Sequence, residues 1–442
     1  MSLRTPATVG KLQAALHTKA KEAPGYRFYA LYDKVYRADV LAYAYERSRA
    51  KGGAAGVDGQ TFADIESYGV GRWLGELAQD LKGKTYRPQA VRRVWLPKAD
   101  GKQRPLGIPT IRDRVVQMAA VLVLEPIFEA DLLPEQYAYR AERSATDAVR
   151  AVQALLDQGH TEVVDADLSG YFDSIPHAEL MKSVARRISD RHVLHLLKMW
   201  LEAPVEETDA HGRMRRTTRN QDERRGTPQG GVASPLLANL YMRRFVLGWK
   251  RLGHERRLEA RIVNYADDFV ILTRAGAAEA LAVMQAMMRR LKLTVNARKT
   301  RTCSMPDEPF TFLGFTFGRQ YSWRTGRAYV APAPAAKKVR AICTKVSAAT
   351  SGRTVWRDEA EQVGKLNQLL LGWANYFRIG YVTAAWRTVQ QHACRRLRWW
   401  LRRKHGAQAG RGEQYPDMQL YERYGLVNLS RVVRRHSLWA KV

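Results

Sequence analysis

The stretch R-I-V-N-Y-A-D-D-F-V-I-L-T, residues 261–273, places two adjacent acids between two apolar, β-branched runs. Each run has the length and composition of a short buried strand, and the acids fall where a tight turn joins them. Two carboxylates at the tip of a buried hairpin need a compensating charge, and a hard divalent cation is the usual one. Tyr265-Ala266-Asp267-Asp268 therefore indicates a metal-binding turn of the kind that polymerases use for nucleotidyl transfer.

The charge of the whole chain points to a polyanionic partner. Its 442 residues carry 73 Lys and Arg against 43 Asp and Glu, a formal charge of +30 with a pI near 10.2. This excess favours nucleic acid over an anionic membrane surface. No apolar run reaches transmembrane length and the N-terminus lacks a signal-peptide core, so we expect a cytoplasmic, nucleoid-associated protein without membrane contact. Three widely spaced cysteines encode neither a disulfide framework nor a zinc site.

The length allows two or three domains, and composition suggests where they meet. Residues 331–442 hold 21 Lys and Arg against 6 Asp and Glu, a net charge of +15 that is half of the whole-chain excess. We expect boundaries near residue 331 and in the segment 407–412. The periodicity predicts helices in 1–50, 111–157 and 276–293, and strands in 161–175, 261–274 and 310–318.

A second acidic motif, V-V-D-A-D-L-S-G-Y-F-D-S-I at 163–175, lies 100 residues before the first. Asp167 follows an apolar strand start and precedes an aromatic pair. A two-metal site needs carboxylates from separate strands that meet at one point, and Asp167 with the later acid pair would supply them. Alone, Asp167 fits a turn or cap residue equally well. The combination of motifs favours the metal ligand.

Two further motifs fit a nucleotide site. R-G-T-P-Q-G-G-V at 225–232 has glycines that allow close backbone approach to a ligand, and Gln229 can bond a sugar or phosphate. L-P-K-A-D-G-K-Q-R-P at 96–105 has a hairpin turn that places Lys98 and Arg104 on opposing arms, where they can clamp a triphosphate. Each motif alone also fits an ordinary loop or a pair of solvated cations.

Together these blocks resemble the reverse transcriptases encoded by bacterial group II introns, the intron maturase family. The resemblance covers residues 28–430. Its parts are the N-terminal block A-A-G-V-D-G-Q-T (54–61), a fingers region (92–148), the palm blocks at 226–242, 265–272, 293–300 and 312–315, and a thumb block L-N-Q-L-L-L-G-W-A-N-Y-F (366–377).

The resemblance implies a role for each matching residue. The metal ligands would be Asp167, Asp267 and Asp268. The nucleotide site would comprise Lys98, Arg104, Leu168, Ser169, Phe172 and Gln229, with Asn296 and Lys299 as further matches. Phe172, five residues after Asp167, would be the steric gate whose ring clashes with a ribose 2′ hydroxyl. On sequence alone this phenylalanine also fits a core aromatic.

The chain departs from the family pattern at two places. Tyr137-Ala138-Tyr139-Arg140-Ala141 replaces a block that usually reads Y/F-G-F-R-P, which affects the expected loop geometry. Ser169 stands where lysine is usual. Only one cysteine follows Cys343, so we expect no HNH-type endonuclease domain, as in compact class C members.

We therefore predict an α+β right-hand polymerase with fingers, an antiparallel palm sheet, a helical thumb and a small basic DNA-binding region. The expected domains are 1–160 (N-terminal extension and fingers), 161–330 (palm), 331–406 (thumb) and 407–442 (basic tail). The resemblance implies two Mg²⁺ ions, with Mn²⁺ as a substitute, and dNTPs as substrates. Its nucleic-acid partners would be intron RNA, an RNA template and a DNA primer or target DNA, and the protein would be a monomer or a dimer.

Two other functions remain open at this point. One is a splicing factor that binds RNA without polymerase activity, which the intact acids disfavour. The other is a domesticated relative in DNA repair, phage defence or CRISPR adaptation, which the absence of a fused accessory domain disfavours. The tryptophans Trp373, Trp399 and Trp400 in the basic third either stack on bases or pack helices, and we favour packing.

Overall fold

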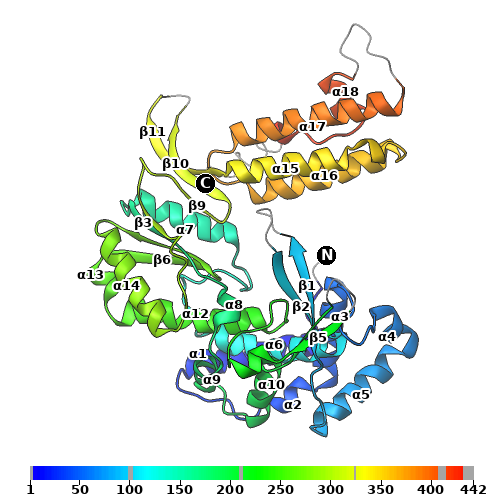
Figure 1. The fold of residues 1–442 in the computed structure, drawn as a ribbon, viewed down its shortest axis with the longest axis vertical. Helices are drawn as coiled ribbons and strands as arrows, with labels where there is room; N and C mark the ends of the chain where they lie inside the picture. Colours follow the sequence, from blue (N-terminus) through cyan, green and yellow to red (C-terminus); the bar gives the residue numbers. More distant parts are fainter. Residues whose placement is uncertain (1–2, 98–102, 209–212, 323–324, 407–414, 432–442) are drawn as a thin grey trace.

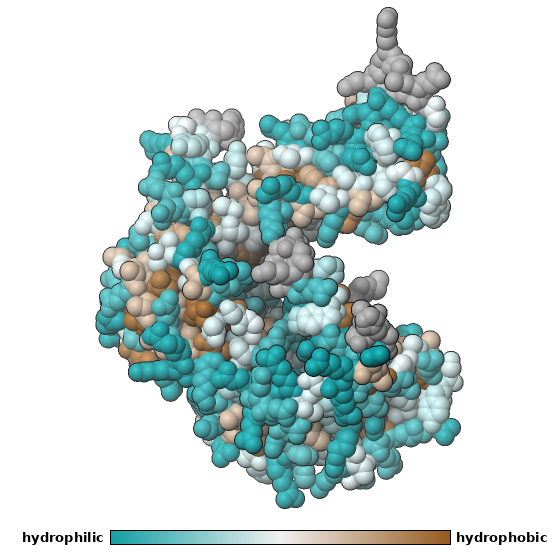
Figure 2. Space-filling model, viewed as in Figure 1, coloured by the Kyte–Doolittle hydropathy of each residue, from teal (hydrophilic) through white to brown (hydrophobic). Residues whose placement is uncertain are grey.

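The computed structural model describes residues 3–97, 103–208, 213–322, 325–406 and 415–431. Figure 1 shows a large lower body of helices and sheets, with a bundle of long helices above it. Figure 2 shows an open cleft between this bundle and the lower body. The predicted right-hand arrangement of fingers, palm and thumb is confirmed. No helix of the described segments is long and apolar enough to cross a membrane.

The central sheet of the body has the antiparallel order β6-β7-β3-β8. Its strands are β3 (Glu162–Asp167), β6 (Ala260–Tyr265), β7 (Asp268–Thr273) and β8 (Arg301–Ser304). Strand β7 is apolar almost throughout because both faces of the sheet are covered. Val270 and Leu272 pack with α7 (Ala145–Asp157), whereas Phe269 and Ile271 pack with α12 (Ser234–Arg251) and α14 (Ala277–Arg290).

The predicted hairpin at 261–273 is confirmed, but the strand predicted over 161–175 is too long. The strand β3 ends at Asp167, and Tyr171–Ser174 form the short helix α8. Gly170 adopts a left-handed conformation with φ of 56°, which turns the chain out of the sheet. The apolar character of Tyr171 and Phe172 comes from burial in a helical turn, which a short periodic pattern cannot distinguish from a strand.

The lower part of the body is built around α6 (Ile111–Glu129). This helix is apolar on nearly all sides because α1 (Ala7–Glu22) and α3 (Ala38–Lys51) cover it. A second sheet of order β2-β1-β4-β5 projects beside it. Its strands are β1 (Val91–Pro97), β2 (Gln103–Ile108), β4 (Val205–Thr208) and β5 (Met214–Thr217).

The upper bundle has its own apolar core. It consists of α15 (Ala336–Ala349), α16 (Glu359–Tyr376), α17 (Thr383–Lys404) and α18 (Asp417–Glu422). In α16 the residues Val363, Leu366 and Leu370 recur at helical spacing and are buried, and the Asp358 carboxylate accepts bonds from the first backbone amides. The basic segment that contains α15 to α18 is therefore a folded helical unit rather than a charged tail.

A three-stranded sheet, β9 (Phe310–Phe312), β10 (Phe315–Tyr321) and β11 (Ala328–Pro334), connects the body to the bundle and confirms the strand pair expected at 310–318. The remaining described elements are short or peripheral: α2 (Tyr32–Val35), α4 (Phe62–Tyr68), α5 (Val70–Lys82), α9 (His177–Ala185), α10 (Arg191–Leu201), α11 (Arg219–Asp222), α13 (His254–Arg257) and the 3-10 turn Gly352–Thr354.

The junction between the sheet and the bundle depends on Gly380. This residue has φ of 76°, and a Cβ atom there would lie 1.9 Å from the carbonyl oxygen of Pro332 in β11. The amide of Tyr381 donates to that same oxygen over 2.8 Å. The loop between α16 and α17 therefore approaches β11 so closely that only glycine fits.

We predict that Gly380→Ala destabilises the protein by about 2 kcal/mol or more, because it combines left-handed strain with a backbone clash. The measurement is the thermal or denaturant unfolding midpoint. The matched control is Gly372→Ala in the middle of α16, where a Cβ meets open space and should stabilise by about 0.5–1 kcal/mol. Equal unfolding midpoints for the two variants would contradict the conclusion that only glycine fits at position 380.

Candidate active site

The acid pair lies at the tip of the β6–β7 hairpin. Tyr265 and Asp268 are the last paired residues of the two strands, so Ala266 and Asp267 form the turn. Ala266 has φ of 57°, as a two-residue hairpin turn requires. The Asn264 side chain, which is fully buried, donates to the carbonyl oxygen of Ala266 over 2.8 Å and holds the turn in place.

The structure brings Asp167 to this tip through strand pairing. In the β3–β7 register Asp167 stands directly opposite Asp268. Its carboxylate accepts a bond of 3.0 Å from the Asn296 amide and pairs with the Lys299 ammonium at 3.2 Å. Asn296 also donates its backbone amide to the carbonyl oxygen of Asp167. The segment after α14 therefore fixes the position of the third acid.

The carboxylates raise one another's affinity for protons. The pKa of Asp268 is raised to about 6, mainly by burial and in addition by the charges of Asp267, Asp167 and Asp165. Burial also raises the pKa of Asp267, with a contribution from Asp167. A bound cation would favour the charged forms of these groups and so offset this cost.

The donor chemistry of the site fits a hard divalent cation. The three predicted ligands would all supply carboxylate oxygens, which Mg²⁺ and Mn²⁺ prefer. In the described parts of the chain, no three His, Cys, Asp or Glu side chains converge tightly enough to form a metal site by themselves.

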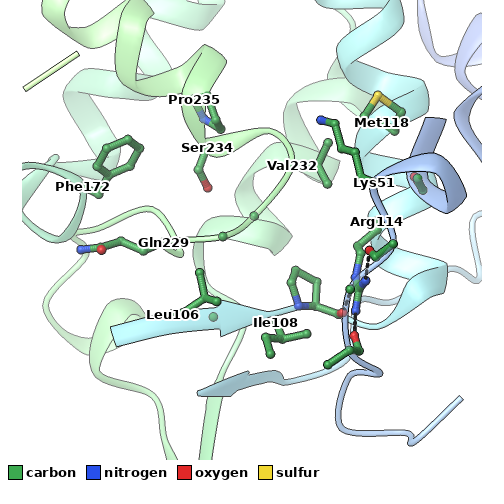
Figure 3. A pocket seen from close by; sticks show the side chains of 18 of the residues that line it. Lys51, Leu106, Ile108, Arg114, Met118, Phe172, Gln229, Val232, Ser234 and Pro235 are labelled. Carbon is green, nitrogen blue, oxygen red and sulfur yellow. Dashed lines mark hydrogen bonds between the residues drawn. The ribbon is translucent and has the colours of Figure 1, made fainter. Parts of the chain in front are cut away.

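A cavity of about 410 Å³ lies between β2, the loop before α12 and the end of α3 (Figure 3). Three of the residues predicted for the nucleotide site line it. The Nε of Arg104 donates to the Oε1 of Gln229 over 3.3 Å, and the Nε2 of Gln229 donates to an Asp173 carboxylate oxygen over 2.8 Å. Phe172 forms part of the wall. Lys98 lies outside the described residues.

Phe172 is a core aromatic, as one of the two interpretations expected, and it also lines the cavity. Its side chain is 9% exposed and packs edge-to-face on Tyr171, with ring centroids 5.7 Å apart. It also lines the cavity, so a change at this position would alter the cavity wall. Leu168 is buried in the body core, whereas Ser169 is exposed and donates its amide to the Thr294 carbonyl oxygen. The side chain of Leu168 therefore faces the core, and its predicted role would fall to its backbone.

The glycine loop is shaped by the hairpin strand against which it rests. Gly230 has φ of 109°, and a Cβ atom there would lie 2.2 Å from the carbonyl oxygen of Gly107 in β2. The Gly107 amide donates to the Gln229 carbonyl oxygen over 2.5 Å. This contact fixes Gln229 against β2, which carries Arg104.

A second cavity of about 620 Å³ extends from the acids to the upper bundle. Its lining includes Asp268 and Lys299 from the body, Gly314 from the connecting sheet, and Lys338 and Tyr376 from the bundle. Both sides of the open cleft therefore contribute to the surroundings of the acids, and lysines of the bundle lie where an anionic strand would pass.

The structure adds residues that the sequence motifs did not identify. Tyr139 lines the 410 Å³ cavity and is half exposed, with φ of 55°. Burial raises the pKa of Tyr139, and the charge of Asp267 adds to the effect. The departure of residues 137–141 from the family pattern was the available signal. Lys51 points into the same cavity from α3 (Figure 3) and had no local sequence signal.

The three tryptophans considered for base stacking, Trp373, Trp399 and Trp400, differ in how far they are buried. Trp400 is fully buried, as predicted for packing. Trp373 is half-buried in the bundle core. Trp399 is 37% exposed, and the guanidinium groups of Arg396 and Arg403 lie over its ring, 4.7 and 5.5 Å from the ring centroid. Of the three, Trp399 is the exposed one, and its ring already makes cation–π contacts with two arginines.

Two family matches cover different parts of the chain, one in the lower body and one in the upper bundle. Residues 96–317 match the reverse transcriptase (RNA-dependent DNA polymerase) family, and residues 339–415 match the group II intron maturase-specific domain. The chain belongs to the group II intron reverse transcriptases. The first match contains the three acids and most of the residues that line the 410 Å³ cavity, and the second contains most of α15 and all of α16 and α17. This reverse transcriptase therefore joins a polymerase domain to a maturase domain.

Its relatives include protein YkfC of Escherichia coli, 32% identical over 381 residues that span 77% of this chain and 96% of YkfC. The group II intron-encoded protein LtrA of Lactococcus lactis is 32% identical over 227 residues, 50% of this chain and 36% of LtrA. A 91 kDa protein in the cob intron of Schizosaccharomyces pombe is 26% identical over 69% of this chain and 45% of its own length. The reverse transcriptase thus spans less than half of the last two relatives.

We predict that Gly230→Ala lowers kcat/KM for dNTP incorporation at least about tenfold, because the added carbon separates the Gln229 loop from β2 by an ångström or more. Steady-state primer extension measures it. The matched control is Gly253→Ala, which has a similar positive φ of 76° but open space around its Cβ. The control should lose stability but keep its kcat/KM, and an equal kinetic loss in both variants would contradict the prediction.

Proposed function

We propose that this protein synthesises DNA on an RNA template by a two-metal mechanism. The single observation that supports it best is the β3–β7 register, which sets Asp167 opposite Asp268 beside Asp267. When bound, two Mg²⁺ ions, or Mn²⁺ in their place, would activate the primer 3′ hydroxyl and stabilise the pyrophosphate. Asp167, Asp267 and Asp268 would hold the ions. The Lys299 ammonium, which neutralises Asp167, would move aside or bond a phosphate oxygen.

The nucleotide cavity would position the incoming dNTP. Arg104 would contact the triphosphate, together with Lys98, as a charge-assisted donor. Its bond to Gln229, and the bond of Gln229 to Asp173, orient two polar groups toward the same space. Phe172 would exclude a ribose 2′ hydroxyl, while Leu168 and Ser169 would contribute backbone and surface to the nucleotide site.

The maturase match supports a second activity. We propose that residues 331–406 form the thumb and, with the basic segment 407–442, bind a group II intron RNA and the target DNA. Residues 1–160 and 161–330 would be the fingers and the palm. The protein would assist splicing of its intron and copy the reverse-spliced intron into DNA. The positive field of the bundle, with two arginines over the ring of Trp399, supports nucleic-acid binding there.

Primer extension on an RNA template with dNTPs and Mg²⁺ tests the polymerase. We predict that Asp267→Asn with Asp268→Asn lowers the rate by about a thousandfold or more, because metal stabilisation of several kcal/mol is lost. Assistance of intron splicing should persist, since RNA binding rests on other surfaces. Asp307→Asn, an exposed carboxylate paired with Arg319, is the control and should extend primers normally. A double variant that retains polymerisation would refute the assignment of the acids.

We predict that Phe172→Ala relaxes the discrimination between dNTPs and rNTPs at least about tenfold, because the ring that lines the cavity is removed. Competition assays with paired dNTP and rNTP substrates measure the ratio. Since Phe172 is also a core residue, the variant should lose about 3–5 kcal/mol of stability. The assays should therefore be run at a temperature well below the thermal unfolding midpoint of the variant. An unchanged ratio in folded protein would rule out the gate.

A further inference from the structure

A groove of about 320 Å³ lies between α9 and α12. The α12 side presents residues at helical spacing, among them Arg244, Leu247 and Arg251, so one face of this helix forms the wall. The α9 side contributes Lys182 and Arg186. In Figure 1 both helices belong to the lower body, away from the bundle α15–α17. The groove shares no lining residue with the nucleotide cavity or with the cavity that reaches the bundle.

The groove is strongly basic. Its lining includes five cationic side chains: Lys182, Arg186, Arg243, Arg244 and Arg251. Of the described lining residues only Asp131 is acidic, and its carboxylate pairs with the buried guanidinium of Arg187 at 3.4 Å. Two carboxylates lie near enough to act on this set, Asp131 on Arg243 and Glu179 on Lys182, so the five cations outnumber the acids around them.

The environment of Arg243 disfavours its charged form. Its side chain is half-buried, and its Nε donates to the backbone carbonyl oxygen of Asp131 over 2.7 Å. Burial lowers the pKa of Arg243, and the charges of Arg186, Arg251 and Arg187 lower it further, against the opposing charge of Asp131. Arg243 is therefore a partly buried cation beside other cations, and an anionic ligand in the groove would favour its charged form.

We propose that this basic groove binds successive phosphates of a folded RNA that lies outside the catalytic cleft. The inference rests on the proposed function in one respect, that the protein binds RNA. Arg244 and Arg251 are seven residues apart, about 10 Å along the helix axis, so the α12 wall spans more than one phosphate. Guanidinium groups bond phosphates in a fork, and the open shape suits a continuous strand better than a free small anion.

Ser183 favours RNA over DNA as the occupant. It lines the groove between Lys182 and Arg186, and its hydroxyl donates to the Glu179 carbonyl oxygen over 2.9 Å. With its proton committed to that bond, the hydroxyl oxygen can accept one from a ribose 2′ hydroxyl. Duplex DNA offers the same phosphates but no such donor.

The test uses the full chain with Lys182→Gln, Arg186→Gln and Arg251→Gln combined, since all three side chains are exposed. The matched control combines Arg256→Gln, Arg289→Gln and Arg290→Gln, which removes the same charge from exposed sites on α13 and α14 outside the groove. The probe is a folded group II intron transcript, with duplex DNA of equal length as the second arm. We expect the groove variant to lower the salt dependence of RNA binding, in log–log slope, by about 2 to 3. The control should leave it unchanged.

Primer extension on a short RNA template, run in parallel, separates this proposal from the polymerase, since the groove variant should extend normally. If the groove variant and the control lowered the salt dependence of RNA binding equally, the attraction would be diffuse and the proposal would be overturned. A change confined to the binding of duplex DNA would overturn it as well. Photo-cross-linking with 4-thiouridine RNA on the unmodified protein is independent of folding in any variant. Cross-links should map to 177–186 or 240–251, and their absence there would also overturn the proposal.

Discussion

The pairing of β3 with β7 is the interaction on which the catalytic arrangement depends. These strands are adjacent in the sheet although 100 residues separate Asp167 from Asp267, and their register sets Asp167 opposite Asp268. Because side chains alternate across a strand, a slip of one residue would turn Asp167 to the other face. The register is held by apolar residues that pack on α7 on one side and on α12 and α14 on the other.

The same sheet concentrates negative charge at one end of its central strands and supports the elements that supply positive charge. Lys299 and Asn296 reach Asp167 from the segment after α14, and Arg104 reaches the nucleotide cavity from β2. The bundle adds Lys338 from the other side of the cleft. Folding therefore surrounds the cluster of carboxylates with basic side chains. This arrangement suits a metal ion at the carboxylates and a polyanion bound around them.

Local motifs predicted the elements that have strong, regular patterns. The β6–β7 turn, the buried α6 and the strand pair at 310–318 follow from apolar periodicity and turn position. The strand predicted through residue 175 was wrong beyond Asp167, because Tyr171 and Phe172 are apolar through burial in a helical turn. Trp399 and Trp400 are adjacent in sequence, yet one is exposed and the other fully buried, since helix packing decides which side faces the core.

The sequence by itself determined the chemistry of this protein: the acids, the glycine loop, the aromatic gate candidate and the basic excess are fixed by residue type and spacing. The tertiary structure alone decided which of these groups meet. Tyr139 and Lys51 line the nucleotide cavity, and Asp173 holds Gln229, through contacts between segments distant in sequence. The cations of α9 and α12 form a groove only because two helices pack side by side, a relation that no local pattern encodes.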